Sequence, residues 1–295
     1  MINDKIDIVI PIASKDIKII KKNIPYISKN IKGCNNIYII TSYLNINKIE
    51  KWINNYPCCR LIDEDKLIEG LSFLKVKHEL QRRGVKQSYG WYFQQFLKMG
   101  FSQSEYCNNF YLSWDADTFP LNEISFFKNG HPLYTVKKEY HKPYFNTIKK
   151  LLGINKIVDH SFIAEHMLFK KSIMNELIND ILSSNVEGNS WYNKIINSCD
   201  FKDSLYSFSE FETYGNYCMH KYPYYYQPQF LNTFREGSLI RGRNINPKIM
   251  KQLSFDLDTV SFEPIHCPSF PWSIPYLFKQ YANKVKNKLQ FIKYE

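Results

Sequence analysis

The sequence lacks the features that mark several protein classes. It holds seven cysteines in 295 residues, an odd number, with no CxxC pair and no zinc-ligand spacing. This pattern argues against a disulfide framework and a structural zinc site, and it favours the reducing cytosol. No run of about 18 apolar residues occurs, and no apolar stretch of the signal-peptide kind follows Met1. We therefore expect no membrane span and no secretion signal.

Motifs of nucleic-acid-binding modules are also missing. The chain has no RNP, KH, helix-turn-helix or zinc-finger pattern. Its 39 basic and 28 acidic residues give a net charge of +11, which favours phosphorylated or otherwise anionic partners. The abundance of Lys, Asn and Ile is equally typical of an AT-rich genome. We expect no nucleic-acid partner, and nucleic-acid binding stays an alternative that a salt-sensitive oligonucleotide shift would support.

Short β-branched runs alternate with amphipathic segments in the first part of the chain. We predict strands at 6–12, 37–41 and 60–62, with helices after residue 16 and at 49–53. This order predicts a βαβαβ unit, and therefore a mostly parallel sheet with helices on both faces. Hydrophobic residues make up 44% of the chain, which suits one globular α/β domain.

The middle of the chain continues this pattern. Helices are predicted at 66–83, 88–99 and 172–182, and strands at 110–114, 133–136 and 162–169. In the helix 88–99, Phe93, Phe96 and Leu97 are expected to face the core. Gln94 and Lys98, four residues apart, are expected to share the opposite side. A lysine there could pair with a diphosphate, and the alternative is an ordinary solvated helix face.

A pair of carboxylates, Asp115-Ala116-Asp117, directly follows the predicted strand 110–114. In open α/β sheets, ligands bind beyond the carboxyl ends of strands, and two carboxylates on a turn can both reach one hard cation. Such a cation bridges nucleotide phosphates and neutralises the charge of a leaving diphosphate. The alternative is a solvated turn, but the position after an apolar strand and a βαβαβ half favours a metal site.

Five segments together carry a resemblance: IDIVIPIASKD, GWYFQQFLKM, YLSWDADTFPL, DHSFIAEHMLF and FSEFETYGNY. In this order, the sequence resembles a family of bacterial GT-A glycosyltransferases from capsule and O-antigen gene clusters. The resemblance implies a GT-A, Rossmann-like fold over 1–272, with a nucleotide-sugar-binding half (1–120) and an acceptor half (121–272). It also implies a nucleotide-sugar donor such as a UDP-sugar, a Mn²⁺ or Mg²⁺ ion, and a glycan or lipid-linked oligosaccharide acceptor.

The resemblance also implies residue roles. Asp115 and Asp117 would bind the metal, and His266 in HCPSFPW would be a further ligand; the alternative for His266 is packing among prolines and aromatic rings. His160 and Glu165 are expected to line the acceptor site, while neighbouring His166 is equally explained as a core histidine. The donor-binding residues implied by the resemblance are Pro11, Ile12, Ala13, Gln94, Lys98, Trp114 and Asp115.

Two glutamates near residue 210 are candidates for the catalytic base. Ser209 and Glu212 match an S-x-x-E capping box, which gives Glu212 a structural role. Glu210 is then the first helical residue, with a carboxylate free to point into a cleft. In the inverting enzymes that this segment resembles, such a carboxylate is the general base. We predict Glu210 as the base and rank Glu212 second; a retaining enzyme needs neither.

The C-terminal residues 273–295 predict a basic amphipathic helix that could lie on an anionic membrane surface, or else pack on the domain. We expect a cytoplasmic protein with peripheral contact at the inner membrane. A glycan-binding module without activity is an alternative, against which Asp115, Asp117 and Glu210 argue. A nucleotidyltransferase would need a glycine-rich loop after the first strand, and residues 13–16 contain no glycine.

Overall fold

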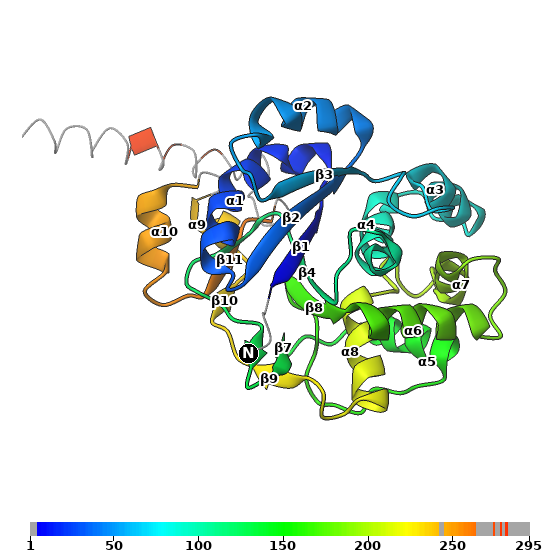
Figure 1. Ribbon diagram of the computed structural model, residues 1–295. Coiled ribbons are helices and arrows are strands. Elements are labelled where there is room, and N and C mark those ends of the chain that lie inside the picture. The colour runs from blue at the N-terminus through cyan, green and yellow to red at the C-terminus, as the bar shows by residue number, and fades with distance from the viewer. Residues whose placement is uncertain (1–4, 242–244, 264–273, 275–277, 279–280, 283–295) are drawn as a thin grey trace, which may run out of the picture.

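A five-stranded sheet forms the centre of the structure (Figure 1), a computed structural model that describes residues 5–241, 245–263, 274, 278 and 281–282. The strand order is β3-β2-β1-β4-β8, with the first four strands parallel and β8 antiparallel to β4. This arrangement confirms the predicted α/β class and the βαβαβ unit. The strands are β1 (Ile6–Pro11), β2 (Cys34–Thr41), β3 (Cys59–Asp63), β4 (Phe110–Trp114) and β8 (His166–Lys170).

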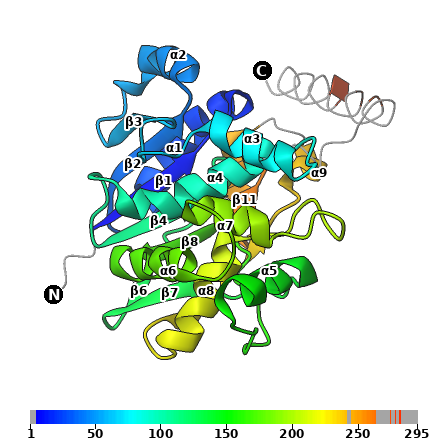
Figure 2. The same ribbon diagram turned by 90° about the vertical axis from the view of Figure 1, so that its right-hand side faces the viewer.

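Helices cover both faces of this sheet (Figures 1 and 2). Ile6, Ile8 and Ile10 of β1 pack in one apolar cluster with α1 (Ile17–Asn30) and α2 (Tyr43–Ile53). Val9 belongs to the cluster on the opposite face, because neighbouring strand residues point to opposite sides. The helices of that second cluster are α3 (Phe73–Arg82), α4 (Tyr89–Gly100), α5 (Lys142–Leu152), α6 (Lys171–Ser183), α7 (Trp191–Ser198) and α8 (Glu210–Lys221).

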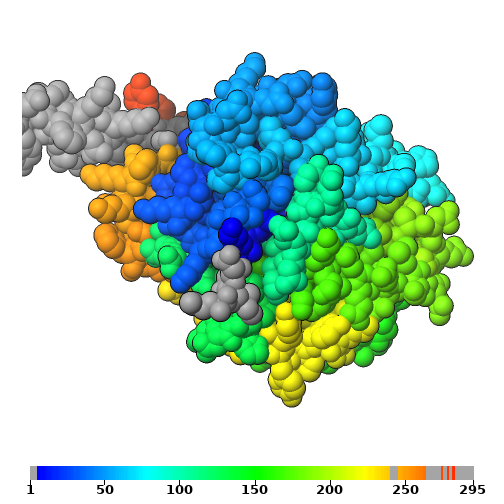
Figure 3. Space-filling model, in the orientation of Figure 1, coloured from blue at the N-terminus to red at the C-terminus, as the bar shows by residue number. Residues whose placement is uncertain are grey.

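Two three-stranded sheets extend the structure beyond the central sheet. One joins β10 (Thr233–Phe234), β11 (Thr259–Ser261) and β5 (Thr118–Pro120); the other joins β6 (Phe127–Lys128), β7 (His131–Thr135) and β9 (Gln227–Gln229). The short helices α9 (Gly237–Arg241) and α10 (Pro247–Leu253) accompany the first of them. Figure 3 shows the surface of α10 (orange) beside that of the N-terminal elements (blue). Met250 of α10 packs in a small apolar cluster with Ile19 of α1.

Two predicted elements begin later than the sequence pattern indicates. The helix predicted over 66–83 begins only at Phe73. Gly70 before it has a φ of 84°, which a helix excludes, and Ser72 caps the helix by accepting a hydrogen bond from the backbone of Lys75. The apolar residues at 67 and 71 therefore pack from a turn and not from a helix.

The strand predicted over 162–169 likewise begins at His166. The residues before it bend, since the backbone N–H of Ile163 donates to the Ser161 hydroxyl and that of Ala164 donates to the Phe162 carbonyl. Side-chain hydrogen bonds of this local kind compete with the strand ladder. The bend places residue 165 at the same sheet edge as the end of β4.

Helix α4 confirms the predicted core residues Phe93, Phe96 and Leu97 but corrects the prediction for its other side. Lys98 is not solvated: only 10% of its side chain is exposed. The helix pattern missed this because α8, more than a hundred residues later, packs against α4 and covers it. Gln94 is only partly buried.

The described part of the chain contains no helix long and apolar enough to cross a membrane. The predicted basic helix 273–295 falls, apart from residues 274, 278 and 281–282, outside the described residues.

Candidate active site

The turn that carries Asp115 and Asp117 is fixed by its backbone. It follows β4, the fourth strand in the sheet order. The Asp115 N–H donates to the Glu165 carbonyl (2.9 Å), and the Asp115 carbonyl accepts from the Thr118 N–H (3.1 Å). The Asp117 carbonyl accepts from the Phe262 N–H (3.0 Å). These main-chain hydrogen bonds therefore fix the shape of the turn.

The side chain of Asn23 in α1 also holds the same turn. Its side-chain amide donates to the carbonyls of Ala116 (3.0 Å) and Thr118 (2.7 Å), and Asn23 is fully buried. The Thr118 hydroxyl bonds that of Ser261 at 2.7 Å. Partners from three distant parts of the chain therefore hold the turn in one shape, as a preorganised site requires.

Lys98 lies between two carboxylates. Its Nζ is 3.0 Å from Asp115 Oδ1 and 3.1 Å from Glu210 Oε1, and it also lies over the ring of Phe211. Burial alone lowers the pKa of Lys98, but the charges of Asp115 and Glu210 outweigh burial and raise it above the ordinary value. Lys98 is therefore a fixed positive charge in contact with the carboxylate pair.

Glu210 is the first residue of α8, as predicted, but its carboxylate is not free. The residue is 4% exposed, and the carboxylate faces Lys98. Its backbone N–H donates to the Gln95 side chain (3.1 Å). Burial raises the pKa of Glu210 above its ordinary value, and the contact with Lys98 opposes this rise.

Glu212 serves the structure in a different way from the one predicted. The Ser209 hydroxyl does cap α8 by accepting from the Glu212 N–H (3.2 Å). The Glu212 carboxylate, however, binds the Ser161 hydroxyl, the Phe162 N–H (3.0 Å) and the Asn216 amide (2.9 Å). The Glu212 carboxylate therefore links the bend before β8 to helix α8 by hydrogen bonds.

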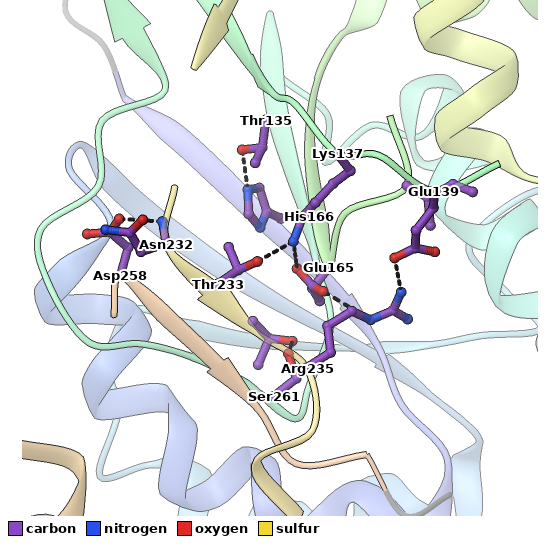
Figure 4. Close-up of polar contacts among 12 residues, drawn as sticks. Thr135, Lys137, Glu139, Glu165, His166, Asn232, Thr233, Arg235, Asp258 and Ser261 are labelled. Atoms are coloured by element: carbon purple, nitrogen blue, oxygen red, sulfur yellow. Dashed lines mark hydrogen bonds and ion pairs between the residues drawn. The ribbon is translucent and has the colours of Figure 1, made fainter. Parts of the chain in front are cut away.

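Glu165 lies in a second charged cluster beside the carboxylate pair (Figure 4). Its carboxylate is 3.6 Å from Lys137 Nζ and 3.1 Å from Arg235 Nε. Arg235 also pairs with Glu139 (2.6 Å) and Glu263 (3.1 Å). Burial raises the pKa of Glu165, while Lys137 and Arg235 act in the opposite direction.

His160, the other predicted acceptor residue, lies among aromatic rings and beside Asp159. Its ring stacks on Tyr134 at 5.3 Å, and its Nδ1 is 3.5 Å from Asp159. Burial lowers the pKa of His160, and the charge of Glu212 is among the influences that raise it. The structure thus places the two predicted acceptor residues in separate clusters.

Trp114 and His166 belong to the core. The Trp114 indole N–H donates to the Thr118 carbonyl (2.7 Å), and the ring stacks on His166 at 4.8 Å. His166 Nε2 bonds the Thr135 hydroxyl at 2.8 Å. Burial, with Lys137 nearby, lowers the pKa of His166 to about 3, so the ring is neutral. His166 fits the description of a core histidine, and the Trp114 side chain is committed to packing.

The remaining predicted donor residues lie at the end of β1. Pro11 and Ile12 are buried, whereas Ala13 is exposed. The Ile12 carbonyl accepts from the Thr41 hydroxyl (2.9 Å) at the end of β2. These strand ends lie at the same sheet edge as Asp115, because β1, β2 and β4 are parallel.

The donor set fits a hard divalent ion. One oxygen of Asp115 contacts Lys98, but the side chain remains 40% exposed, and Asp117 is half-buried next to it. Mg²⁺ is commonly held by one or two carboxylates and completed by phosphates and water. Within the described residues, no group of three or more His, Cys, Asp and Glu side chains forms a complete metal cage. His266, the predicted third ligand, lies outside the described residues.

Sequence reasoning missed Lys137 and Arg235. Each follows a strand, Lys137 after β7 and Arg235 after β10. Basic residues at the ends of strands are a signal that could have identified them. Their convergence on Glu165 depends on which small sheets form, and sequence spacing does not reveal that.

A family model matches residues 3–237 and is described as "Family of unknown function (DUF6492)". No protein with a curated description matches the chain in sequence.

Solved structures with a similar fold include three glycosyltransferases. The apo structure of the bifunctional glycosyltransferase WbbM has a TM-score of 0.42 and 14% identity, and covers 88% of this chain. The chain spans only 45% of WbbM. The galactosyltransferase LgtC, with donor and acceptor sugar analogues, has a TM-score of 0.41 and 10% identity, covering 87% of each chain. Mouse xyloside xylosyltransferase 1 has a TM-score of 0.46 and 10% identity, covering 90% of this chain and 99% of its own. Likenesses this distant assign no role to any residue here.

Proposed function

Because the chain belongs to DUF6492, a family of unknown function, we propose its activity from the site itself: it is a metal-dependent GT-A glycosyltransferase. It moves a sugar from a nucleotide-diphosphate donor, such as a UDP-sugar, to a hydroxyl of a glycan acceptor. The observation that carries the proposal is the rigid Asp115–Asp117 turn at the carboxyl end of β4, with Lys98 in contact. A carboxylate pair beside a fixed cation suits a diphosphate held with a divalent ion.

Asp115 and Asp117 would hold Mn²⁺ or Mg²⁺, and the ion would neutralise the charge of the leaving diphosphate. Lys98 supplies a second positive charge at a fixed position. Since Lys98 already contacts Asp115, its ammonium needs little movement to reach a phosphate oxygen. Pro11, Ile12 and Ala13, at the end of β1 in the same sheet edge, with Gln94 on α4, complete the donor side of the proposed site.

The inverting reaction is our preferred stereochemical outcome. In that reaction Glu210 accepts the proton of the attacking hydroxyl, which requires Lys98 to exchange Glu210 for the donor diphosphate. The proximity of the three groups supports such an exchange. A retaining reaction is the alternative, and in it Glu210 would keep its contact with Lys98 throughout.

The proposed acceptor is a glycan of bacterial surface polysaccharide, free or lipid-linked. The resemblance of five sequence segments to enzymes of capsule and O-antigen synthesis supports this acceptor class. The net charge of +11 and the basic residues 273–295 suit a cytoplasmic enzyme in contact with the inner membrane. His160 stays on the acceptor side of the proposed site.

The test is a panel of nucleotide sugars, measured with and without Mn²⁺. We expect at least one member to raise the melting temperature and to be slowly hydrolysed, and both effects to require the metal. A protein that responds to no nucleotide sugar, or responds equally in a chelator, would contradict the proposed function.

A further inference from the structure

The Glu165 carboxylate is buried without a hydrogen bond. Only 2% of the residue is exposed, and neither carboxylate oxygen has a hydrogen-bond partner among the described residues. Lys137 and Arg235 neutralise its charge at 3.6 and 3.1 Å, but in a geometry that satisfies neither oxygen. A buried ionised group normally has hydrogen bonds, because losing those to water is unfavourable. Within the described residues, both oxygens therefore keep an unused capacity to accept hydrogen bonds.

The two cations that contact Glu165 also have other partners. Lys137 Nζ donates to the Thr233 hydroxyl. Arg235 pairs with Glu139, and its Nε donates to Glu263 as well as lying close to Glu165. Figure 4 shows Lys137 and Arg235 pointing toward Glu165, with Thr233 beside Lys137. The cluster is thus a network of ion pairs and hydrogen bonds, and not an isolated ion pair.

The cluster adjoins the proposed diphosphate site. The Glu165 carbonyl accepts the Asp115 N–H, so the two residues are neighbours across β4 and β8. In the sheet order, β1, β2 and β3 lie on one side of β4, while β8 is the edge strand on the other. Adjacent strands are about 4.8 Å apart, so three strand ends provide roughly 10–15 Å for a nucleoside. The side of β8, where Lys137 and Arg235 contact Glu165, is then left for the smaller end of the donor.

We infer that Glu165, Lys137 and Arg235 form the subsite that binds neighbouring hydroxyls of the sugar to be transferred. The inference rests on the proposed function. Adjacent hydroxyls of a pyranose both donate and accept hydrogen bonds. The Glu165 oxygens accept from two of them, while Lys137 and Arg235 donate to their oxygen atoms. This moves Glu165 from the acceptor side, where the sequence pattern places it, to the donor sugar.

The subsite makes Glu165 a specificity-determining residue. A site built to bind a hydroxyl rejects an analogue that lacks it, since a buried charged group is then left unpaired. The enzyme should therefore distinguish sugars by the hydroxyls that reach Glu165, and should tolerate changes elsewhere on the ring.

The experiment compares the affinity of nucleotide sugars with that of their sugar-free nucleotides by calorimetry with Mn²⁺. The probes are UDP-glucose, UDP-galactose, UDP-N-acetylglucosamine, GDP-mannose and dTDP-glucose, with UDP, GDP and dTDP. In Glu165→Gln we expect the affinity for the preferred nucleotide sugar to fall at least about tenfold. The affinity for its nucleoside diphosphate should stay within about twofold.

Glu105→Gln is the matched control, because it removes one carboxylate at an exposed position before β4, outside the Glu165 cluster, and it should leave both affinities unchanged. Glu165→Asp keeps the charge but shortens the side chain, and it should lose the same sugar-dependent affinity. Because the buried charge is retained, this second variant keeps the test valid if Glu165→Gln fails to fold. An equal loss for nucleotide and nucleotide sugar would overturn the inference. So would unchanged donor binding with lost transfer, which would return Glu165 to the acceptor side. A wild-type protein that binds no probe would contradict the proposed function itself.

Discussion

Lys98 and Asp115 form a contact of 3.0 Å between an almost fully buried ammonium and a half-exposed carboxylate. The same ammonium lies 3.1 Å from Glu210. A protein cation therefore already partly neutralises the carboxylate that is proposed to hold a divalent ion. The charge balance of these three side chains would set how strongly the proposed ion is held before a donor arrives.

Asp117→Asn should weaken metal-assisted donor binding by at least about tenfold, or about 1.4 kcal/mol, because it removes one anionic ligand. The fold should remain intact, since the turn is held mainly by backbone and Asn23 hydrogen bonds. Calorimetry with a nucleotide sugar and Mn²⁺ measures the change. The control is Asp203→Asn, at an exposed position. Undiminished turnover in Asp117→Asn, or full activity in a chelator, would rule out the metal site.

Lys98→Met and Glu210→Gln should change Mn²⁺ affinity in opposite directions. Removing the ammonium leaves Asp115 more negative and should tighten Mn²⁺ binding about tenfold. Removing the charge of Glu210 leaves the positive charge of Lys98 less neutralised and should weaken Mn²⁺ binding. Free Mn²⁺ measured by electron paramagnetic resonance in the absence of donor reports both changes. Shifts of the same sign would show that the variants act only through local structure.

The two glutamates of α8 should differ in what they control. If Glu210 is the base, Glu210→Gln should lower kcat by about 10²–10⁴-fold, while donor affinity at saturating Mn²⁺ changes little. Glu212→Gln should instead lower the free energy of unfolding by about 1–3 kcal/mol, since it disturbs a buried network of three hydrogen bonds. Steady-state kinetics and denaturant unfolding on both variants separate the roles. A retaining enzyme would keep most of its kcat in Glu210→Gln.

The sequence pattern was sufficient for the βαβαβ unit because its apolar runs and helices are local. It was also sufficient to place the Asp115–Asp117 pair at the end of a strand. It left open whether Lys98 is solvated, because only the packing of α8, a distant segment, buries that side of α4. A single helix pattern carries no information on a later helix that covers it.

The capping-box motif shows a similar limit. Ser209 caps α8 as the motif predicts, and this local interaction is confirmed. The Glu212 carboxylate instead accepts hydrogen bonds from residues distant in sequence, because the bend at Ser161 and Phe162 provides two buried donors. The ion pairs of Lys137 and Arg235 with Glu165 could not be predicted for the same reason, since they form only when the short strands pair.

His166 should make the protein less stable in mild acid. Its folded pKa of about 3 lies below the unfolded value of about 6.5, so the unfolded chain binds the proton first. This contribution to stability is complete above pH 6.5 and is lost as the pH falls through the window from 6.5 toward 3. Between pH 6.5 and 5, it amounts to about 2 kcal/mol.

Denaturant unfolding of wild type and His166→Gln at pH 7.5 and 5.0 measures this contribution. The wild type should lose about 2 kcal/mol more than the variant on acidification. His78→Gln is the control, because it removes a histidine at an exposed position. An equal pH dependence of the unfolding free energy in all three proteins would mean that His166 does not cause the loss of stability in acid.

Membrane contact should depend on the basic C-terminal residues. Replacing Lys284, Lys286 and Lys288 by Gln removes about 1 kcal/mol of surface attraction per lysine at low salt. The wild type should pellet with phosphatidylglycerol vesicles, and the triple variant should remain largely in the supernatant. Lys48→Gln with Lys51→Gln on α2 is the control. Identical co-sedimentation of all three proteins would assign the C-terminal lysines no role at the membrane.

The turn that carries the two aspartates is completed by residues from far along the chain. Thr118 is bonded to Ser261 across 143 residues, and Asn23 reaches Ala116 across 93. Closing loops of this length costs chain entropy, so such contacts form after the local ones. During synthesis, the β1–β3 unit can therefore be folded while the aspartate turn is still unformed. We expect the ability to bind a donor to mature last, so that partly made chains are folded in part but inert.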